Sequence, residues 1–187
     1  IAEKLELKKY GGYILSYNGG EITNWQTGEL MYENVLDADV LPYLYQCAKD
    51  NQFAIVTYKD KYVLTEHPDD EYVLKEAILN VMETKKVDNF LDAIDFPVAK
   101  CLIVGEATRL AELEKVMYEA LKERMGVYRS EPYFLELVPK GIDKAQSLAV
   151  LLEKIGATKE EMIAVGDGFN DLSMIKFAGL GVAMANA

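Results

Sequence analysis

Residues 162–174, with the sequence MIAVGDGFNDLSM, constrain the fold of this chain more than any other segment. Residues 162–165 form a short apolar run that predicts a buried strand, and the glycines on both sides of Asp167 predict a tight turn directly after it. A helix is expected over 171–177 and a second apolar strand over 180–183. A buried strand, a helix and another buried strand in this order are typical of a parallel α/β sheet.

The segment before this strand predicts another helix. Asp143 is a suitable N-cap, and the apolar residues that follow it recur at helical spacing up to Gly156, where a glycine can end the helix. Residues 158–161 (TKEE) have the spacing of a capping box and predict a further short helix. The C-terminal part of the chain is therefore expected to be α/β.

The N-terminal part begins with an apolar run at 12–16, which predicts a buried strand, and Tyr17-Asn18-Gly19-Gly20 predicts a turn after it. The middle of the chain alternates β-like runs with amphipathic helices, apart from an acidic and irregular stretch at 84–97. Strands are expected at 21–24, 30–35, 53–58, 61–65, 100–104, 127–130 and 133–138. Helices are expected at 37–51, after Pro68 with Val73, Ala77, Ile78 and Val81 inward, and at 108–125 with Leu110, Leu113, Val116, Met117 and Leu121 inward.

Strands in hairpins between helices predict an α+β module with an antiparallel sheet. The chain is therefore predicted to be an α/β protein whose core domain is split between residues 1–20 and 138–187. The predicted α+β domain is inserted between them, at residues 21–137. No internal repeat or low-complexity segment interrupts this organisation.

The predicted turn after the strand at 162–165 collects polar side chains. Asp167 lies just past the C-terminal end of that strand, where open α/β sheets bind ligands, and Asn170 and Asp171 begin the next helix. Three oxygen-bearing side chains within five residues suit a hard cation such as Mg²⁺. Two alternatives are weaker: Asp171 could serve only as a helix cap, or the segment could be a dinucleotide fingerprint, in which Asp171 would occupy the third glycine position and repel a pyrophosphate.

Composition limits the other function classes. Against 31 acidic residues the chain has 20 lysines and arginines, a net charge of −11, which argues against nucleic acid as a partner. No uncharged apolar run approaches the roughly 20 residues of a membrane-spanning helix, so no membrane partner is expected. Cys47 and Cys101 are expected to be buried thiols in a reducing cytoplasm, and His67, the single histidine, is expected in a solvated loop.

The segment GDGFNDLSM resembles motif IV of the haloacid dehalogenase (HAD) superfamily, in the form typical of Cof-type subclass IIB phosphatases. The segment 135–144 (LELVPKGIDK) is similar to the re-entry into the core domain in that subclass, with Lys144 in the place of the motif III lysine. Residues 17–20 resemble the Asn-Gly turn before the cap, and 181–187 the run after motif IV. The resemblance implies a HAD-like Rossmannoid parallel sheet, incomplete here, with an inserted α+β cap of type C2.

The resemblance also implies roles for individual residues. Asp167, Asn170 and Asp171 would hold or orient Mg²⁺, and Asp171 could instead orient Lys144. Lys144 would neutralise charge in the transition state of phosphoryl transfer, with Asp167 and Asp171 as its catalytic partners. Asn18 and Gly19, together with Lys144 and Asn170, would contact the substrate. Lys140 is an alternative candidate for the motif III lysine.

Two expected elements of the family are absent from the sequence. Motif I, Asp-x-Asp-Gly-Thr, supplies the attacking aspartate, and no Asp-x-Asp-Gly occurs in the chain; the motif II Thr or Ser before Gly-Arg is also missing. We therefore expect the chain to be a fragment that lacks the nucleophile, with further residues before Ile1 and with two central strands of the sheet missing.

The resemblance implies a Mg²⁺-dependent phosphatase that acts on a small phosphorylated metabolite, such as a sugar phosphate or a phosphorylated cofactor. It names neither the substrate nor the oligomeric state. A phosphomutase of the same superfamily, or a non-catalytic module that binds Mg²⁺, phosphate or a partner protein, remains an alternative.

Overall fold

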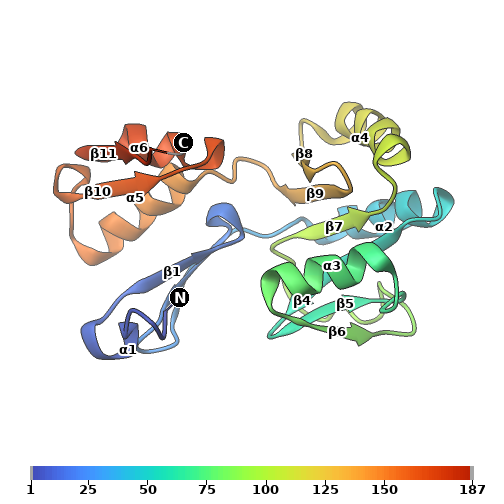
Figure 1. Ribbon diagram of the computed structural model, residues 1–187, viewed down its shortest axis with the longest axis horizontal. Helices are drawn as coiled ribbons and strands as arrows, with labels where there is room; N and C mark the ends of the chain where they lie inside the picture. The colour runs from blue at the N-terminus through green and yellow to red at the C-terminus, as the bar shows by residue number, and fades with distance from the viewer. Residues whose placement is uncertain (1, 186–187) are drawn as a thin grey trace. The chain divides into compact units, whose positions relative to one another are not determined.

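The computed structural model describes residues 2–185, apart from the side chain of Phe169. The chain forms two compact units, which we describe separately. Unit 1 combines Ile1–Asn34 with Ile142–Ala187, and unit 2 is the continuous segment Val35–Gly141. In Figure 1, unit 1 contains the blue and the red ends of the chain, and unit 2 contains the segments coloured from cyan to light orange.

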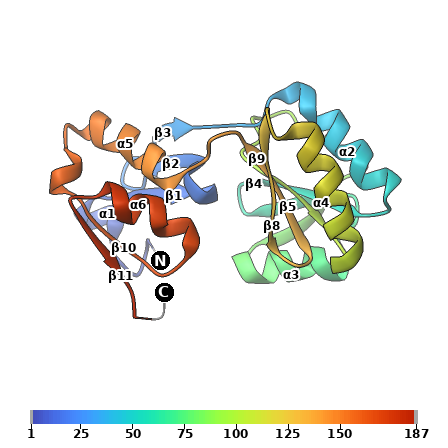
Figure 2. The same ribbon diagram turned by 90° about the horizontal axis from the view of Figure 1, so that it is seen from above.

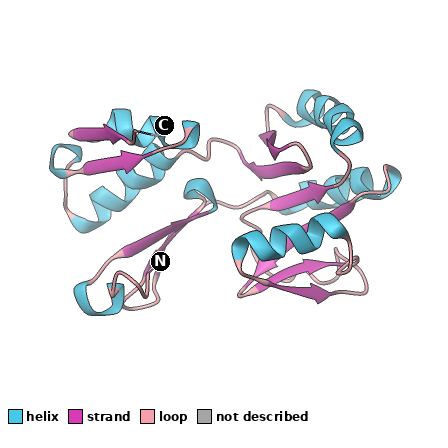
Figure 3. Ribbon diagram, in the orientation of Figure 1, coloured by secondary structure: helices cyan, strands magenta, loops and turns pink. Residues whose placement is uncertain are grey.

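Unit 2 is built on a six-stranded sheet, whose strands are magenta in Figure 3. The order of its strands is β6-β5-β4-β7-β9-β8. Its strands are β4 (Ala54–Lys59), β5 (Tyr62–Thr65), β6 (Glu83–Lys86), β7 (Cys101–Val104), β8 (Met125–Glu131) and β9 (Phe134–Pro139). Neighbouring strands are antiparallel except β5 and β6, which are parallel. The sequence predicted every strand but β6, whose residues Glu-Thr-Lys-Lys lack the apolar alternation of a half-buried strand.

The main core of unit 2 lies between the sheet and two helices, α2 (Leu41–Asp50) and α4 (Ala107–Leu121). A short 3₁₀ turn, η2 (Ala38–Val40), precedes α2. Both helices turn an apolar face inward, and the sheet contributes alternate residues of β4, β7, β8 and β9 to the same cluster. Leu44, Ile103, Leu110, Met117 and Leu135 are completely buried there.

The third helix of unit 2, α3 (Glu71–Asn80), packs against β5 and β6. Its buried residues are Val73, Glu76 and Ala77, whereas Ile78 and Val81 are 75% and 93% exposed. The predicted inward positions of Ile78 and Val81 are therefore wrong, because the buried stripe centres on Glu76 and Val81 leaves the helix with a left-handed backbone. The predicted inward position of Val116 in α4 is also wrong, because Val116 is 64% exposed.

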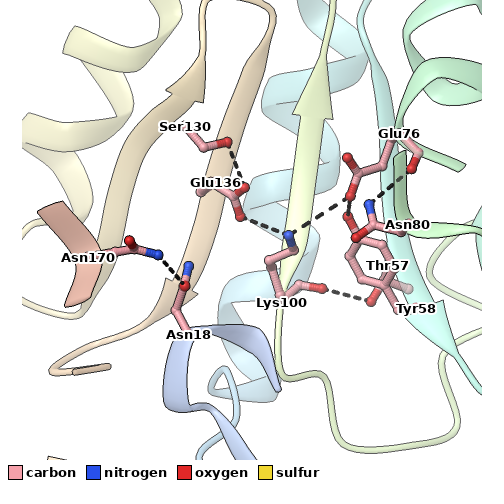
Figure 4. Close-up of polar contacts among 9 residues, drawn as sticks. All are labelled: Asn18, Thr57, Tyr58, Glu76, Asn80, Lys100, Ser130, Glu136 and Asn170. Atoms are coloured by element: carbon pink, nitrogen blue, oxygen red, sulfur yellow. Dashed lines mark hydrogen bonds and ion pairs between the residues drawn. The ribbon is translucent and has the colours of Figure 1, made fainter. Parts of the chain in front are cut away.

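A polar cluster is buried where α3 meets the sheet (Figure 4). The Tyr58 hydroxyl donates to Glu76 Oε1 at 2.5 Å, and Lys100 Nζ lies 4.0 Å from the same oxygen and 3.0 Å from Glu136 Oε2. Ser130 Oγ donates to Glu136 Oε1 at 2.8 Å. Burial, followed by the neighbouring Glu76, raises the pKa of Tyr58 well above its usual value. One lysine thus stands between two buried carboxylates, each of which also accepts a hydroxyl.

Unit 1 contains two small sheets. The strands β1 (Tyr13–Ser16), β2 (Glu21–Asn24) and β3 (Leu30–Glu33) form an antiparallel meander, and β10 (Ile163–Gly166) pairs in parallel with β11 (Leu180–Ala183). The helical elements are α1 (Leu7–Tyr10), η1 (Tyr17–Gly19), α5 (Lys144–Ile155), η3 (Lys159–Glu161), η4 (Phe169–Asp171) and α6 (Leu172–Phe177). Helix α5 contacts η1, β2 and β3 as well as α6, so it joins the two halves of unit 1 (Figure 2).

The parallel pair confirms the α/β class that the sequence predicts. Its apolar side chains are nevertheless exposed, with Ile163 at 66%, Val165 at 54% and Leu180 at 56%. The sequence pattern of these strands is that of a sheet buried on both faces. In the described residues, the pair β10–β11 and the meander β1–β2–β3 remain separate sheets.

The boundaries of the units differ from those expected from the sequence, which were 20/21 and 137/138. Residues 21–34 belong to unit 1 because β2 pairs with β1, β3 pairs with β2, and Asn34 N donates to Gly20 O at 2.7 Å. Residues 138–141 belong to unit 2 because β9 continues to Pro139 beside β8. Strand pairing therefore moves the boundaries to 34/35 and 141/142.

Three further expectations concern single features. No helix within residues 2–185 is long and apolar enough to cross a bilayer. Cys101 is a buried thiol, whose pKa burial raises to about 12, and Cys47 is a half-buried one. His67 is exposed in the loop between β5 and α3, as predicted.

Candidate functional site

Lys144 is the first residue of α5, and the local sequence determines where that helix begins. Asp143 has an extended backbone, and its carboxylate accepts from the backbone N–H groups of Ala145 and Gln146 at 2.9 and 3.1 Å. These bonds satisfy amides that the first turn of a helix leaves without partners. The helix ends at Gly156, which takes the left-handed conformation expected of a C-terminal glycine.

Asp171 lies in the turn between β10 and α6, directly against the backbone of the strand end. A β-carbon added to Gly166 would meet Asp171 Cβ at 2.4 Å, so only glycine permits this packing. The Asp171 Oδ2 atom accepts from the backbone N–H groups of Asp167 and Gly168 at 3.1 and 3.2 Å. The carboxylate is therefore fixed by its own turn, and its residue is 7% exposed.

Lys144 and Asp171 form an ion pair at the centre of the site. Lys144 Nζ donates to Asp171 Oδ1 at 2.5 Å, and the two side chains are 18% and 10% exposed. The bond from Lys144, aided by the two backbone N–H groups, holds the pKa of Asp171 below its usual value. An ammonium has three N–H donors and Asp171 Oδ1 takes one, so Lys144 retains donors for an anionic ligand.

Asn18 and Asn170 form a second contact of the site, shown in Figure 4. Asn170 Nδ2 donates to Asn18 Oδ1 at 3.2 Å, although 152 positions separate them in the sequence. Asn18 has a left-handed backbone with a φ of 56°, a conformation that asparagine tolerates better than most residues. The structure thus brings the predicted residues Asn18, Lys144, Asn170 and Asp171 together in unit 1.

Gly19, which the sequence also placed in the site, has a different kind of contact. Its carbonyl oxygen accepts from Ser147 Oγ at 2.6 Å, and Ser147 is 2% exposed. Ser147 was not predicted from the sequence. Its only local signal is its place one helical turn after Lys144, and its partner lies 128 positions away.

The donors at the strand end are suitable for Mg²⁺. Asp167 and Asn170 are both exposed there, and the Asn170 Oδ1 atom sits where a side chain at Gly168 would otherwise lie, 2.7 Å from an added β-carbon. Mg²⁺ typically takes one or two carboxylates and completes its shell with water and substrate oxygens. Among the described residues, no three His, Cys, Asp or Glu side chains group as a metal cage. Asp167 and Asn170 would leave the rest of such a shell to water and substrate oxygens.

Lys140, the alternative lysine, belongs to unit 2. Its Nζ donates to the backbone carbonyl of Glu123 at 2.7 Å and lies 3.2 Å from the Glu123 carboxylate. Both side chains are exposed. The structure thus gives Lys140 a surface partner, and gives Lys144 a partner in the predicted motif.

Comparison with known proteins gives a family match over the whole sequence. The haloacid dehalogenase-like hydrolase family matches residues 1–187. A crystal structure of a haloacid dehalogenase-like hydrolase from Bacteroides thetaiotaomicron is 58% identical, with a TM-score of 0.96, and covers 100% of this chain and 70% of that one.

Two more distant proteins are also similar to this chain. The HMP-PP phosphatase of Escherichia coli strain CFT073 is 28% identical over 179 residues, which are 94% of this chain and 63% of that protein. The structure of the HAD subclass IIB sugar phosphatase BT4131 shares the fold at a TM-score of 0.75 and 19% identity, covering 100% of this chain and 69% of that one. The chain therefore spans 63–70% of the lengths of these three proteins.

Proposed function

Because the chain belongs to the haloacid dehalogenase-like hydrolase family, we propose that it forms part of a Mg²⁺-dependent phosphatase acting on small phosphate monoesters. The observation that carries this proposal is the Lys144–Asp171 ion pair, anchored to the turn that presents Asp167. It combines a fixed cation with an exposed carboxylate at the C-terminal end of a parallel strand, where α/β proteins bind ligands.

In this proposal, Lys144 binds an oxygen of the transferring phosphoryl group. Its charge counters the excess negative charge of the transition state, and Asp171 keeps the ammonium in place so that it need not reorient during the reaction. Both carboxylate oxygens of Asp171 already accept bonds from the protein. We therefore assign Asp171 the role of positioning Lys144, in preference to direct contact with a metal.

Asp167 and Asn170 are the residues that would hold Mg²⁺. When bound there, the ion would polarise the phosphoryl oxygens and offset part of the acidic background of a chain with a net charge of −11. Asn18 accepts from Asn170 Nδ2 and so orients the amide oxygen of Asn170.

The attacking group in this proposal is an aspartate that residues 1–187 do not supply, because the sequence has no Asp-x-Asp-Gly. It would be carried by a longer form of the protein, which we call the active form. The substrate class we propose is a sugar phosphate or a phosphorylated cofactor, in keeping with relatives that are named HMP-PP phosphatase and sugar phosphatase.

The proposal is tested first on the active form. A panel of sugar phosphates, phosphorylated cofactors and p-nitrophenyl phosphate should be hydrolysed only when Mg²⁺ is present. Asp167→Ala should abolish that turnover, since no other exposed carboxylate of the described turn could replace this ligand. Unchanged kinetics of Asp167→Ala across a Mg²⁺ titration would contradict the assignment.

The chain 1–187 provides the second test. It should hydrolyse none of the panel, because no positioned carboxylate is left to attack phosphorus. Turnover that survives purification and disappears in Asp167→Ala would show that the chain has its own nucleophile. If the longer form binds Mg²⁺ but hydrolyses none of the panel, a binding module is favoured instead.

A further inference from the structure

Resting on the proposed function, we propose that Ser147 is a positioning residue. Its buried hydroxyl closes a ring of hydrogen bonds that runs from α5 to η1, from η1 to η4, and from η4 back to α5. The ring would hold Asn170 and Lys144 at fixed positions relative to each other, although the Ser147 hydroxyl itself binds Gly19 O and Asp143 O.

The first link joins α5 to η1. Ser147 Oγ lies 2.6 Å from Gly19 O and 3.1 Å from Asp143 O, the carbonyl one turn earlier in its own chain segment. A hydroxyl has one proton to donate, and a bond to the i−4 carbonyl alone would be an ordinary local feature of serine in a helix. The shorter distance assigns the proton to Gly19, so the hydroxyl bridges two segments that are far apart in sequence.

The other two links close the ring. Asn18, the neighbour of Gly19, accepts from Asn170 at 3.2 Å, which joins η1 to η4. Asp171, the neighbour of Asn170, accepts from Lys144 at 2.5 Å, which joins η4 to α5. Lys144 and Ser147 are one turn apart on the same helix, so α5 is the rigid side of the ring.

The contact between η1 and α5 is close enough to depend on glycine. A β-carbon on Gly19 would lie 2.6 Å from Ser147 Oγ and 3.2 Å from Asp143 O, and Gly19 has a φ of 107°. Most residues avoid this conformation, which glycine adopts freely. The backbone of η1 can therefore approach the Ser147 hydroxyl this closely because residue 19 is glycine.

Ser147→Ala should remove this link with little change in volume. In the active form we expect kcat to fall about threefold to tenfold, the scale of one buried hydrogen bond, with a smaller change in KM. Ser147→Cys keeps a weak donor of similar size and should lose less. Thr57→Val is the matched control: it removes a buried hydroxyl-to-carbonyl bond of 2.9 Å to Lys100 O in unit 2, and should leave kcat unchanged.

The decisive measurement is a double-mutant cycle on kcat between Ser147→Ala and Asn18→Ala, which remove different links of the same ring. The double variant should lose little more than the worse single variant, because either change opens the ring. Multiplicative losses in the cycle, or wild-type kcat in Ser147→Ala, would overturn the proposal.

A structural readout separates this inference from the proposed function. In the chain 1–187, the side-chain amide resonances of Asn170 should shift in Ser147→Ala and in Asn18→Ala, and should stay in place in Thr57→Val. If Asp167→Ala leaves turnover intact, the proposed function fails, yet the amide shifts still decide whether the ring exists. If Asp167→Ala is inactive and the Asn170 amide resonances do not shift in Ser147→Ala, the ring proposal is contradicted while the proposed function stands. Should Ser147→Ala not fold, Ser147→Cys gives the same readout with a smaller expected shift.

Discussion

Units 1 and 2 each bury a lysine against acidic side chains, and the difference between the two clusters lies in their neighbours. The side chains of Lys144 and Lys100 are 18% and 16% exposed, so burial does not distinguish them. The carboxylates of unit 2 also accept the hydroxyls of Tyr58 and Ser130, which complete an internal network. The carboxylate of Asp171 instead accepts backbone amides of a turn.

The candidate site differs from the structural cluster in the polar groups that it leaves at the surface. The turn that holds Asp171 presents Asp167 and Asn170 at the surface, within reach of a ligand. In unit 2, two carboxylates, Glu76 and Glu136, share one lysine, and the stack of α3 on the sheet covers them. We therefore expect Lys100 to matter for stability and Lys144 for chemistry.

The largest effect should come from Lys100→Met, which leaves two buried carboxylates without their cation. Removing one partner of a buried ion pair costs about 3 kcal/mol or more. Protection of the β7 and β9 amides against hydrogen exchange should fall accordingly, since it reports the local stability of unit 2. Lys122→Met removes an exposed pair with Glu119 and is the control, with a change below about 1 kcal/mol. Equal effects of the two variants would mean that the cluster contributes no more than a surface pair.

Next in size is the loss of Lys144. In the active form, Lys144→Ala should lower kcat by about 10²-fold, the scale of losing one electrostatic stabiliser of a transition state. Lys140→Ala should change kcat little, because Lys140 pairs with Glu123 on the surface of unit 2. The steady-state kinetics of both variants decide the matter, and the reverse pattern would transfer the role to Lys140.

Tyr58→Phe should have a smaller effect and refine the picture of unit 2. It removes one hydroxyl from Glu76, a hydrogen bond to a charged group that contributes about 1.5 kcal/mol or more. Urea unfolding of the variant should show this loss with kcat unchanged in the active form. A fall in kcat at unchanged stability would instead connect the cluster with the reaction.

The sequence predicted the family and most of the secondary structure of both units. The family and the enzyme class, a hydrolase related to phosphatases, are confirmed. Most strands and helices were predicted from compact apolar runs, as in β7, or from apolar residues at helical spacing, as in α4. Asp143, Gly156 and the capping box at Thr158 also lie where their local chemistry placed them.

The misses have a common physical cause, which is contact between distant segments. Strand β6 exists because its backbone pairs with β5, and no pattern in its own side chains indicates it. Helical spacing predicts Ile78 in the core. The spacing cannot show that Glu76 is buried instead, where its carboxylate accepts the Tyr58 hydroxyl. The role of Ser147 depends on Gly19, a partner that only the folded chain brings near.

The smallest effect we predict is the change with pH in the stability that the Lys144–Asp171 pair contributes. The pKa of Asp171 is lowered in the folded state, first by the bond from Lys144 and then by its backbone partners. A carboxyl group of this kind contributes stability that is present above its unfolded pKa, about 3.9, and is lost as the pH falls through the lower folded value. The difference in unfolding free energy between the wild type and Asp171→Asn should therefore be largest near neutral pH and shrink below about pH 4.

Urea unfolding of the chain 1–187 between pH 7 and pH 3 would measure that difference. Asp95→Asn is the control, because Asp95 pairs with Lys59 at 2.7 Å on the surface of unit 2 and has a pKa lowered in the same direction. Salt at about 1 M shortens the range of electrostatic interactions to about 3 Å and should erase the effect of the exposed pair. The pair in unit 1 is largely shielded from solvent and should keep most of its effect. A difference for Asp171→Asn that stays constant from pH 7 to pH 3 would show that it does not arise from the charge of Asp171, and the bond from Lys144 would then have to act through packing alone.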